Sequence, residues 1–300
     1  MLATKRIIIL DIMRVIAVGL IIAVHIAQKL GSPLGGFFGI EGFYYVTWGG
    51  IGVTLFLILS GMAIELSYAK KKVDFREFML KRIQRIYPIY WMTLIFAILI
   101  TLYLGNPLGF TWKNYLFNAT GLQGLSGMHW ETIFISPVTW FIGLIMALYL
   151  LYPFVSKMMD KQKNFILLAI LIISIFSRWY VGKYWLSVHR PIDWFPLCRL
   201  FEFSLGLWLI KTERVYNFIQ SLSLSIFNKP VTFLAVISFP AFLIHFPLLK
   251  LFPLQNSWEI PLFLITTIFL AWLILLLDNK IQKNISLTSL FSSSEAPKST

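Results

Sequence analysis

Long apolar stretches alternate with short basic segments along most of the chain. A helix that crosses a bilayer needs roughly 20 predominantly apolar residues. Eight stretches approach this length, at about residues 7–28, 44–68, 87–104, 138–157, 164–181, 194–211, 231–251 and 260–277. The pattern predicts an all-α fold, a polytopic transmembrane helix bundle of about eight spans, within one integral membrane domain at residues 1–285.

Polar residues and prolines interrupt two of these stretches. The sixth contains Arg199 and Glu202, and the seventh contains His245 between two prolines. Interruptions of this kind are tolerated inside a membrane only where neighbouring helices or a polar cavity satisfy the freed groups. We therefore expect both stretches to face a polar interior.

The composition agrees with a membrane protein. Hydrophobic residues make up 58% of the chain, charged residues 13%, and the mean hydropathy is +0.77. Charged residues are roughly a quarter of an ordinary soluble domain. The single cysteine, Cys198, excludes an internal disulfide framework.

The net charge of +13 is distributed as membrane topology predicts, not as a nucleic-acid site would require. With the N-terminus inside, the cytoplasmic segments hold eighteen Lys and Arg residues and the external segments hold six. The positive-inside rule then places both termini in the cytoplasm.

The tail at 286–300 is rich in Ser and poor in apolar residues, so we expect it to be disordered. The segment 105–137 is predicted to be a long external loop.

The basic segment before the third span has its own helical pattern. Asp74 and Glu77 resemble a capping box, which predicts a short helix whose apolar side lies along the membrane surface. Arg82 and Arg85, three positions apart, would project together as a fork for phosphate. The alternative is that these charges only set topology and contact anionic lipid.

Ionisable residues inside spans are costly and are functional candidates by default. They are Asp11, Arg14, His25, Glu65, Arg199, Glu202 and His245. Arg14 and His25 share a helix face and stand about 16 Å apart along the axis, with Asp11 about 21 Å from His25. A partner for His25 must therefore come from another helix, where Arg199 and His245 have the right depth and Glu202 lies nearer the middle. Alternatively, His25 only fills a polar gap or reaches the outer interface.

Several blocks, taken in order, resemble the membrane acyltransferases that include polysaccharide O-acetylases. The first is Leu10-Asp11-Ile12-Met13-Arg14 followed, after ten residues, by His25. The others are Leu57 to Met62, Arg82 to Pro88, Trp140 with Tyr149 to Pro153, Arg199 to Gly206, and Ile237 to Pro247. Six ordered blocks cover most of the chain.

The resemblance implies transfer of an acyl group, usually acetyl, from cytoplasmic acyl-CoA to a hydroxyl of an extracytoplasmic or lipid-linked glycan. It implies a catalytic role for His25 and acyl-CoA binding by Arg14, Arg82 and Arg85. The resemblance also implies supporting or substrate-site roles for Asp11, Trp140, Arg199, Glu202 and His245. No metal is expected, and acetyl-CoA is the expected donor.

The chain departs from the family pattern in two respects. Ile145 and Met146 stand where many relatives have acidic residues after the tryptophan of the fourth helix. Relatives usually have ten spans, and the missing pair would fall between Gly206 and Ile237.

The partners expected are acyl-CoA, a glycan acceptor and membrane lipids, without nucleic acid, in a bacterial inner membrane. The alternatives are a glycan or small-molecule transporter, and an inactive relative acting as a membrane partner.

Overall fold

The computed structural model describes residues 7–31, 48–68, 74–105, 111–122, 135–185, 191–222 and 228–294. Within these ranges every regular element is helical and no strand occurs. The elements are α1 (Ile8–Lys29), α2 (Trp48–Tyr68), α3 (Phe75–Tyr103), α4 (Trp112–Thr120), the 3-10 turn η3 (Pro137–Thr139), α6 (Trp140–Tyr184), α7 (Pro191–Trp194), α8 (Pro196–Lys211), α9 (Glu213–Ser221), α10 (Asn228–Leu249) and α11 (Glu259–Ser294).

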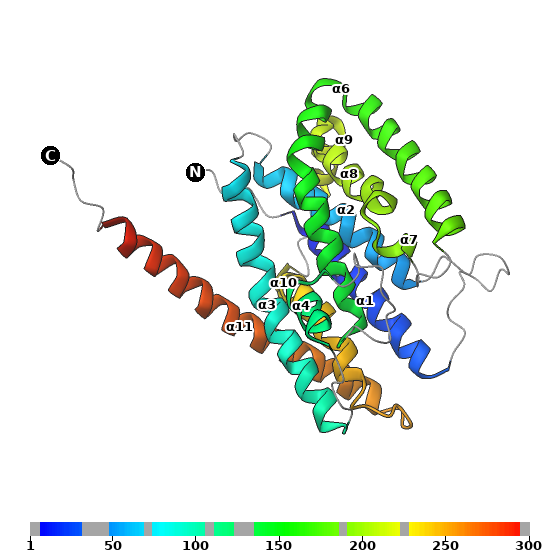
Figure 1. Cartoon of the computed structure of the whole chain (residues 1–300), viewed down its shortest axis with the longest axis vertical. Coiled ribbons are helices and arrows are strands. Elements are labelled where there is room, and N and C mark those ends of the chain that lie inside the picture. The colour runs from blue at the N-terminus through cyan, green and yellow to red at the C-terminus, as the bar shows by residue number, and fades with distance from the viewer. Residues whose placement is uncertain are drawn as a thin grey trace.

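Six helices in the described part of the chain are long and apolar enough to cross a membrane: α1, α2, α3, α6 with η3, α10 and α11. The helix α6 contains non-helical backbone at Gln162, where the chain reverses between two arms (Figure 1). The predicted stretches 138–157 and 164–181 fall on these arms. With 16 residues, α8 spans about 24 Å, less than the roughly 30 Å of a hydrocarbon core. The number of spans and the cytoplasmic placement of both ends stay predictions.

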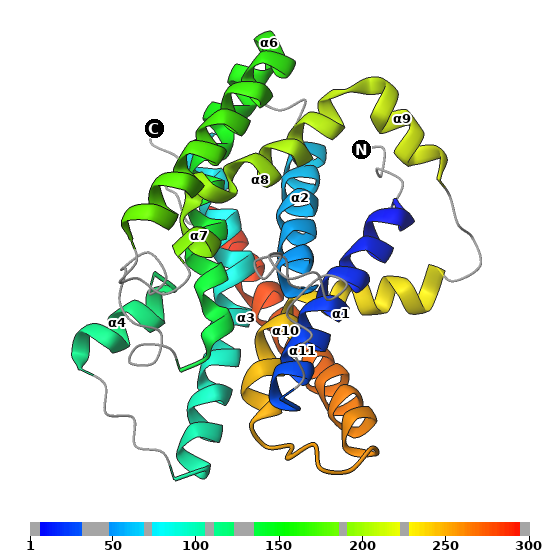
Figure 2. The same cartoon turned by 90° about the vertical axis from the view of Figure 1, so that its right-hand side faces the viewer.

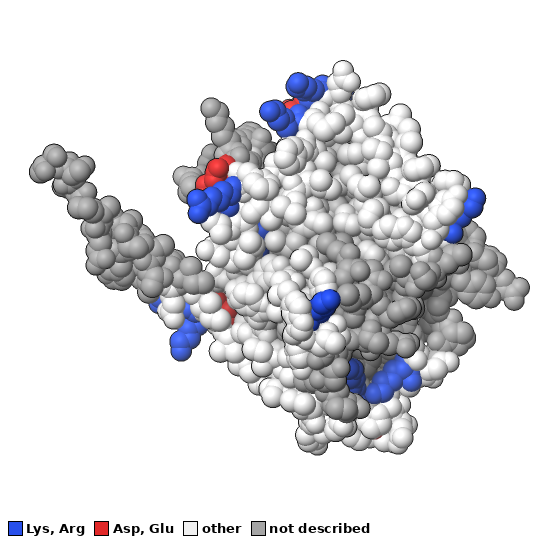
Figure 3. Space-filling view, in the orientation of Figure 1, with Lys and Arg blue, Asp and Glu red and all other residues white. Residues whose placement is uncertain are grey.

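Apolar side chains cover much of the outer surface. Large exposed residues include Phe165 and Phe176 on the second arm of α6, and Ile265 and Phe269 on α11. Figure 3 shows Lys, Arg, Asp and Glu in small groups, with broad uncharged surface between them. Exposed apolar area of this extent indicates contact with lipid rather than with water.

The helices pack in two connected groups. On one side α2 packs against α8, and α8 against α6; on the other α1 packs against α10, and α10 against α11 and α3. The contacts of α1 with α2, of α3 with α6 and of α10 with η3 join the groups, and Figure 2 shows α1 beside both α2 and α10. The polar residues of the predicted site are therefore divided between two groups of helices.

Two glycines allow α2 and α8 to cross at backbone distance. A Cβ atom added at Gly61 would lie 2.1 Å from the carbonyl oxygen of Phe203. One added at Gly206 would lie 2.1 Å from the carbonyl oxygen of Ile58. Close approach through small residues is a common way for membrane helices to associate, because it maximises van der Waals contact.

The third span differs from its prediction. Asp74 caps α3 as expected, its Oδ2 accepting from the Glu77 amide at 2.8 Å. A separate surface helix is wrong, however, because α3 runs unbroken from Phe75 to Tyr103 through Pro88. Proline removes the amide that would bond to the carbonyl four residues earlier. That carbonyl, of Gln84, instead accepts from Nε2 of Gln282 on α11 at 2.6 Å.

Other helix boundaries also differ from those predicted from the sequence. The helix α4 occupies part of the predicted loop 105–137, while residues 106–110 and 123–134 lie outside the described residues. The prolines of the seventh stretch do not break α10. The helix α11 continues to Ser294, past the predicted boundary at 285, because no Gly or Pro occurs between Leu262 and Ala296 to end it. Residues 295–300 of the predicted tail lie outside the described residues.

The close crossing of α2 and α8 at Gly61 and Gly206 gives the first prediction. Gly206→Ala should destabilise the protein by about 1–3 kcal/mol, because the new methyl group meets backbone atoms that cannot move aside. The measurement is the thermal unfolding midpoint of purified protein in detergent. Gly19→Ala is the matched control, since a Cβ there meets nothing within 4 Å and alanine favours helix. Equal midpoints for Gly206→Ala and the wild type would contradict the crossing.

Candidate functional site

Two histidines from helices distant in sequence meet inside the bundle. Nδ1 of His25 on α1 lies 2.8 Å from Nε2 of His245 on α10. The ring centroids are 5.0 Å apart and the planes are inclined by 24°. His245 has 0% of its surface exposed, whereas His25 is partly exposed. The structure thus brings together His25 and one of the three residues considered as its partner.

The backbone determines which ring nitrogens carry hydrogen. Nδ1 of His245 lies 2.7 Å from the carbonyl oxygen of Phe242, which can only accept a hydrogen bond. Nδ1 of His245 is therefore the donor. A charged imidazolium at a fully buried position is costly, so a neutral His245 has its lone pair on Nε2. That nitrogen accepts from Nδ1–H of His25, and the lone pair of a neutral His25 lies on Nε2.

Aromatic residues surround the pair. Phe246 meets the His25 ring edge-on, with centroids 5.1 Å apart. Phe242 contacts both Phe56 of α2 and Phe141 of α6, at 5.8 and 5.3 Å between centroids. Trp140, the first residue of α6, contacts Phe141. The aromatic cluster therefore connects the predicted supporting residue Trp140 to the helix that carries His245.

A buried tyrosine on the first arm of α6 lies within electrostatic range of the three predicted arginines. The phenol of Tyr149 interacts electrostatically with Arg82, Arg85 and Arg14 and lies beside Ser60. Tyr149 belongs to one of the sequence blocks but was not singled out as a site residue. Its interaction with arginines of both α1 and α3 depends on how the helices assemble.

The individual arginines have different environments. Arg14 donates to buried Asp11 at 3.0 Å, so these residues form an ion pair one helical turn apart. The Arg82 guanidinium lies 5.7 Å from the ring centres of Tyr68 and Phe78, and its buried Nε has no hydrogen-bond partner among the described residues. Arg85 is exposed. The two members of the predicted fork thus differ in burial while acting on the same tyrosine.

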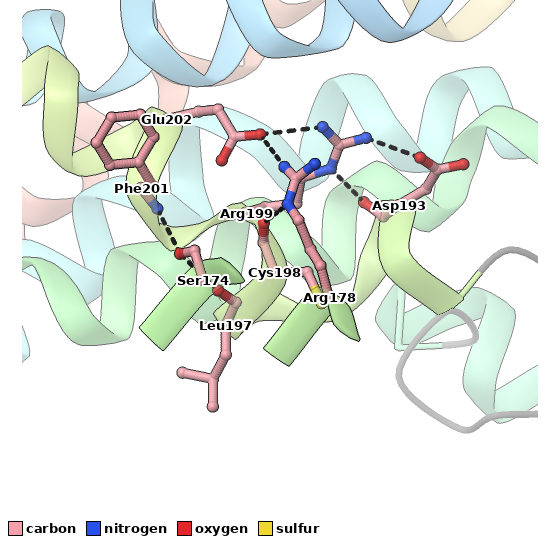
Figure 4. Close-up of polar contacts among 8 residues, drawn as sticks. All are labelled: Ser174, Arg178, Asp193, Leu197, Cys198, Arg199, Phe201 and Glu202. Atoms are coloured by element: carbon pink, nitrogen blue, oxygen red, sulfur yellow. Dashed lines mark hydrogen bonds and ion pairs between the residues drawn. The ribbon is translucent and has the colours of Figure 1, made fainter. Parts of the chain in front are cut away.

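Arg199 and Glu202 belong to a separate network at the start of α8 (Figure 4). Arg199 donates to Glu202 at 3.1 Å and to the Asp193 carboxylate at 2.7 Å. Arg178 of α6 also pairs with Glu202 and donates to the carbonyl oxygen of Cys198 at 2.8 Å. These contacts join α6, α7 and α8, and the charged partners of Arg199 and Glu202 among the described residues are Asp193 and Arg178 rather than His25.

Glu65 forms a third polar cluster. Its carboxylate is fully buried, accepts from Ser156 at 3.0 Å and pairs with Lys211 at 2.9 Å. Lys211 also pairs with Asp160, so the cluster joins α2, α6 and α8. Sequence reasoning missed Lys211 and Ser156 because both lie near predicted span ends. Among the described residues no group of three His, Cys, Asp or Glu side chains could hold a metal ion.

A helical bundle with apolar outer faces and internal polar clusters defines an integral membrane protein. The profile of acyltransferase family 3, described as an acyltransferase domain, matches residues 7–226. The chain therefore belongs to acyltransferase family 3 and is a membrane acyltransferase. No curated protein and no solved structure matches it. The matched range ends before α10, so the position of His245 beside His25 comes from the geometry alone.

The α8 network gives the second prediction. Arg199→Ala should destabilise the fold by about 3–5 kcal/mol, because it leaves the Glu202 carboxylate buried beside a single cation. The thermal unfolding midpoint measures the effect, and Arg199→Ala with Glu202→Leu should recover part of it. Lys183→Ala, at the exposed end of α6, is the control. A midpoint unchanged by Arg199→Ala would show that the network contributes little to stability.

Proposed function

We propose that the protein transfers an acyl group, in the first instance acetyl, from acyl-CoA to a hydroxyl of an extracytoplasmic or lipid-linked glycan. The hydrogen-bonded series from Phe242 through His245 to His25 is the observation that supports it. A general base needs a lone pair on a defined atom within reach of the proton that it removes. In this proposal that atom is Nε2 of His25.

The proposed reaction is a direct transfer. The acceptor oxygen attacks the thioester carbonyl carbon while Nε2 of His25 removes the hydroxyl proton. The tetrahedral intermediate then collapses, the carbon–sulfur bond breaks, and the departing CoA thiolate takes the proton from Nε2. The products are the glycan ester and CoA, and His25 returns to its neutral form. His245 would stabilise the transient imidazolium by accepting from Nδ1–H, as a positioned acceptor does for other catalytic histidines.

The donor site is proposed at the arginines around Tyr149. Guanidinium groups bind phosphate through charge-assisted hydrogen bonds, and the unpartnered Nε of Arg82 is a donor available to such a ligand. Arg14 lies about 16 Å from His25 along the axis of α1. Arg82 and Arg85 would hold the nucleotide phosphates, and Arg14 would guide the pantetheine arm toward His25. Positioning both substrates in one enclosed site supplies most of the rate in such a scheme.

The histidine pair gives the third prediction. His25→Ala should lower acetyl transfer roughly 10²- to 10⁴-fold, the usual contribution of a general base. His245→Leu should lower it roughly 10- to 100-fold, because His25 loses the acceptor that orients its ring. His245→Asn should recover part of this loss, since the amide oxygen can accept from Nδ1–H.

The assay follows radiolabelled acetyl-CoA in nanodiscs, with membrane glycolipid extract as the acceptor source. Acetyl-CoA binding and the thermal midpoint of each variant serve as controls for folding. Full transfer by His25→Ala would refute its assignment as the base. Equal losses in His245→Leu and His245→Asn, with unchanged midpoints, would remove His245 from the mechanism.

The donor site gives the fourth prediction. Arg85→Ala should weaken acetyl-CoA binding roughly tenfold or more, because one charge-assisted contact to phosphate is lost. Equilibrium binding of radiolabelled acetyl-CoA to purified protein measures the effect. Arg76→Ala, an exposed arginine on the same helix, is the matched control for loss of basic charge. If both variants weaken binding equally, the basic segment attracts the nucleotide without forming a specific site.

A further inference from the structure

A small pocket lies where the ends of α1 and α10 meet beyond the histidine pair. Its volume is about 270 Å³ and its lining is His25, Gln28, Lys29, Phe246, Leu249 and Lys250. One wall is therefore the candidate general base, and two lysines lie beside it. Arg14 of the proposed donor site lies about 16 Å from His25 along α1, toward the opposite end of that helix. On the proposed mechanism the pocket is therefore on the acceptor side.

The first lysine is held in place by the backbone. Nζ of Lys29 donates to the carbonyl oxygen of Leu249, the last residue of α10, at 2.6 Å. An ammonium group has three donors, so this contact leaves two for a ligand. The carboxylate of Glu259 interacts electrostatically with the Lys29 ammonium group. Its oxygens also accept from the Gln255 amide at 3.2 Å and from Asn256 at 3.0 Å, at the start of α11.

The second lysine, Lys250, has an exposed side chain whose ammonium group is only partly desolvated. Burial of its ammonium group lowers the pKa of Lys250 below the ordinary lysine value. No carboxylate of the described residues forms an ion pair with it. Partial desolvation disfavours the charged form, and a bound anion would restore it. The polar side chains of the lining are Gln28, the neutral His25 and the two lysines, so its charge is entirely positive and favours an anionic ligand over a neutral sugar.

We infer that this pocket binds an anionic group of the acceptor, a carboxylate or phosphate on the glycan, through Lys29 and Lys250. The acceptor would then lie with a nearby hydroxyl at Nε2 of His25. This inference rests on the proposed acyl transfer and adds to it the chemical class of the acceptor. A neutral glycan would leave both cations without a partner from the ligand.

The test measures binding without any acyl donor. Three disaccharides are compared on purified protein in phosphatidylcholine nanodiscs: cellobiose, cellobiouronic acid and cellobiose phosphate. At least one anionic disaccharide should bind roughly tenfold more tightly than cellobiose. Lys250→Gln and Lys29→Gln should each weaken that binding about three- to fivefold, as expected for partly exposed ion pairs. Lys183→Gln, on an exposed part of α6, should leave it unchanged.

Three results would overturn the inference. Equal affinity for all three disaccharides would show that the pocket does not select charge. Equal weakening by Lys183→Gln would show that only net charge matters. Loss of disaccharide binding in phosphatidylglycerol nanodiscs, restored by phosphatidylcholine, would assign the lysines to a lipid headgroup. Because no acyl-CoA is present, any of these results leaves the His25 transfer assay intact, and a failed transfer assay does not alter the binding result.

Discussion

The pairing of buried polar groups is the constraint on which this bundle depends. Lipid tails are as apolar as the outer faces of the helices, so burying apolar surface contributes little free energy to the association of one helix with another. A buried charge without a partner is costly, and this makes each pair specific. His25 with His245 joins α1 to α10, Glu65 with Lys211 joins α2 to α8, and Arg178 with Glu202 joins α6 to α8.

Local features of the fold could be predicted from the sequence. The apolar stretches coincide with helices, and Asp74 begins α3, because length, hydropathy and a side-chain cap are properties of adjacent residues. The continuation of α3 through Pro88 was not predicted, and the Gln84 carbonyl that the proline leaves free accepts from Gln282, which is 198 positions away. The contact of Gly61 and Gly206 with opposing backbone likewise gives a physical reason for the glycines in two of the sequence blocks.

The candidate site was predictable in its residue types and not in their contacts. Depth along a helix placed Arg199 and His245 near the level of His25 and Glu202 nearer the middle, but depth does not determine which neighbour a side chain faces. The missing information was that Arg199 bonds to Asp193 on the short helix α7. Ile145 and Met146, where relatives have acidic residues, are buried in the apolar core. The hydrogen bond between His25 and His245 instead joins α1 to α10.

The packing of α1 separates the two halves of the proposed reaction. Between Arg14 and His25 the helix presents Val18, Ile21 and Ile22, all buried in the core. A nucleotide with several negative charges would pass that apolar section only at a far higher desolvation cost than the uncharged pantetheine arm. On the proposed mechanism the section thus retains phosphates at the arginines and admits only the acyl arm to the histidines. The proton moves between groups on the acceptor side, so no net charge needs to cross the apolar core.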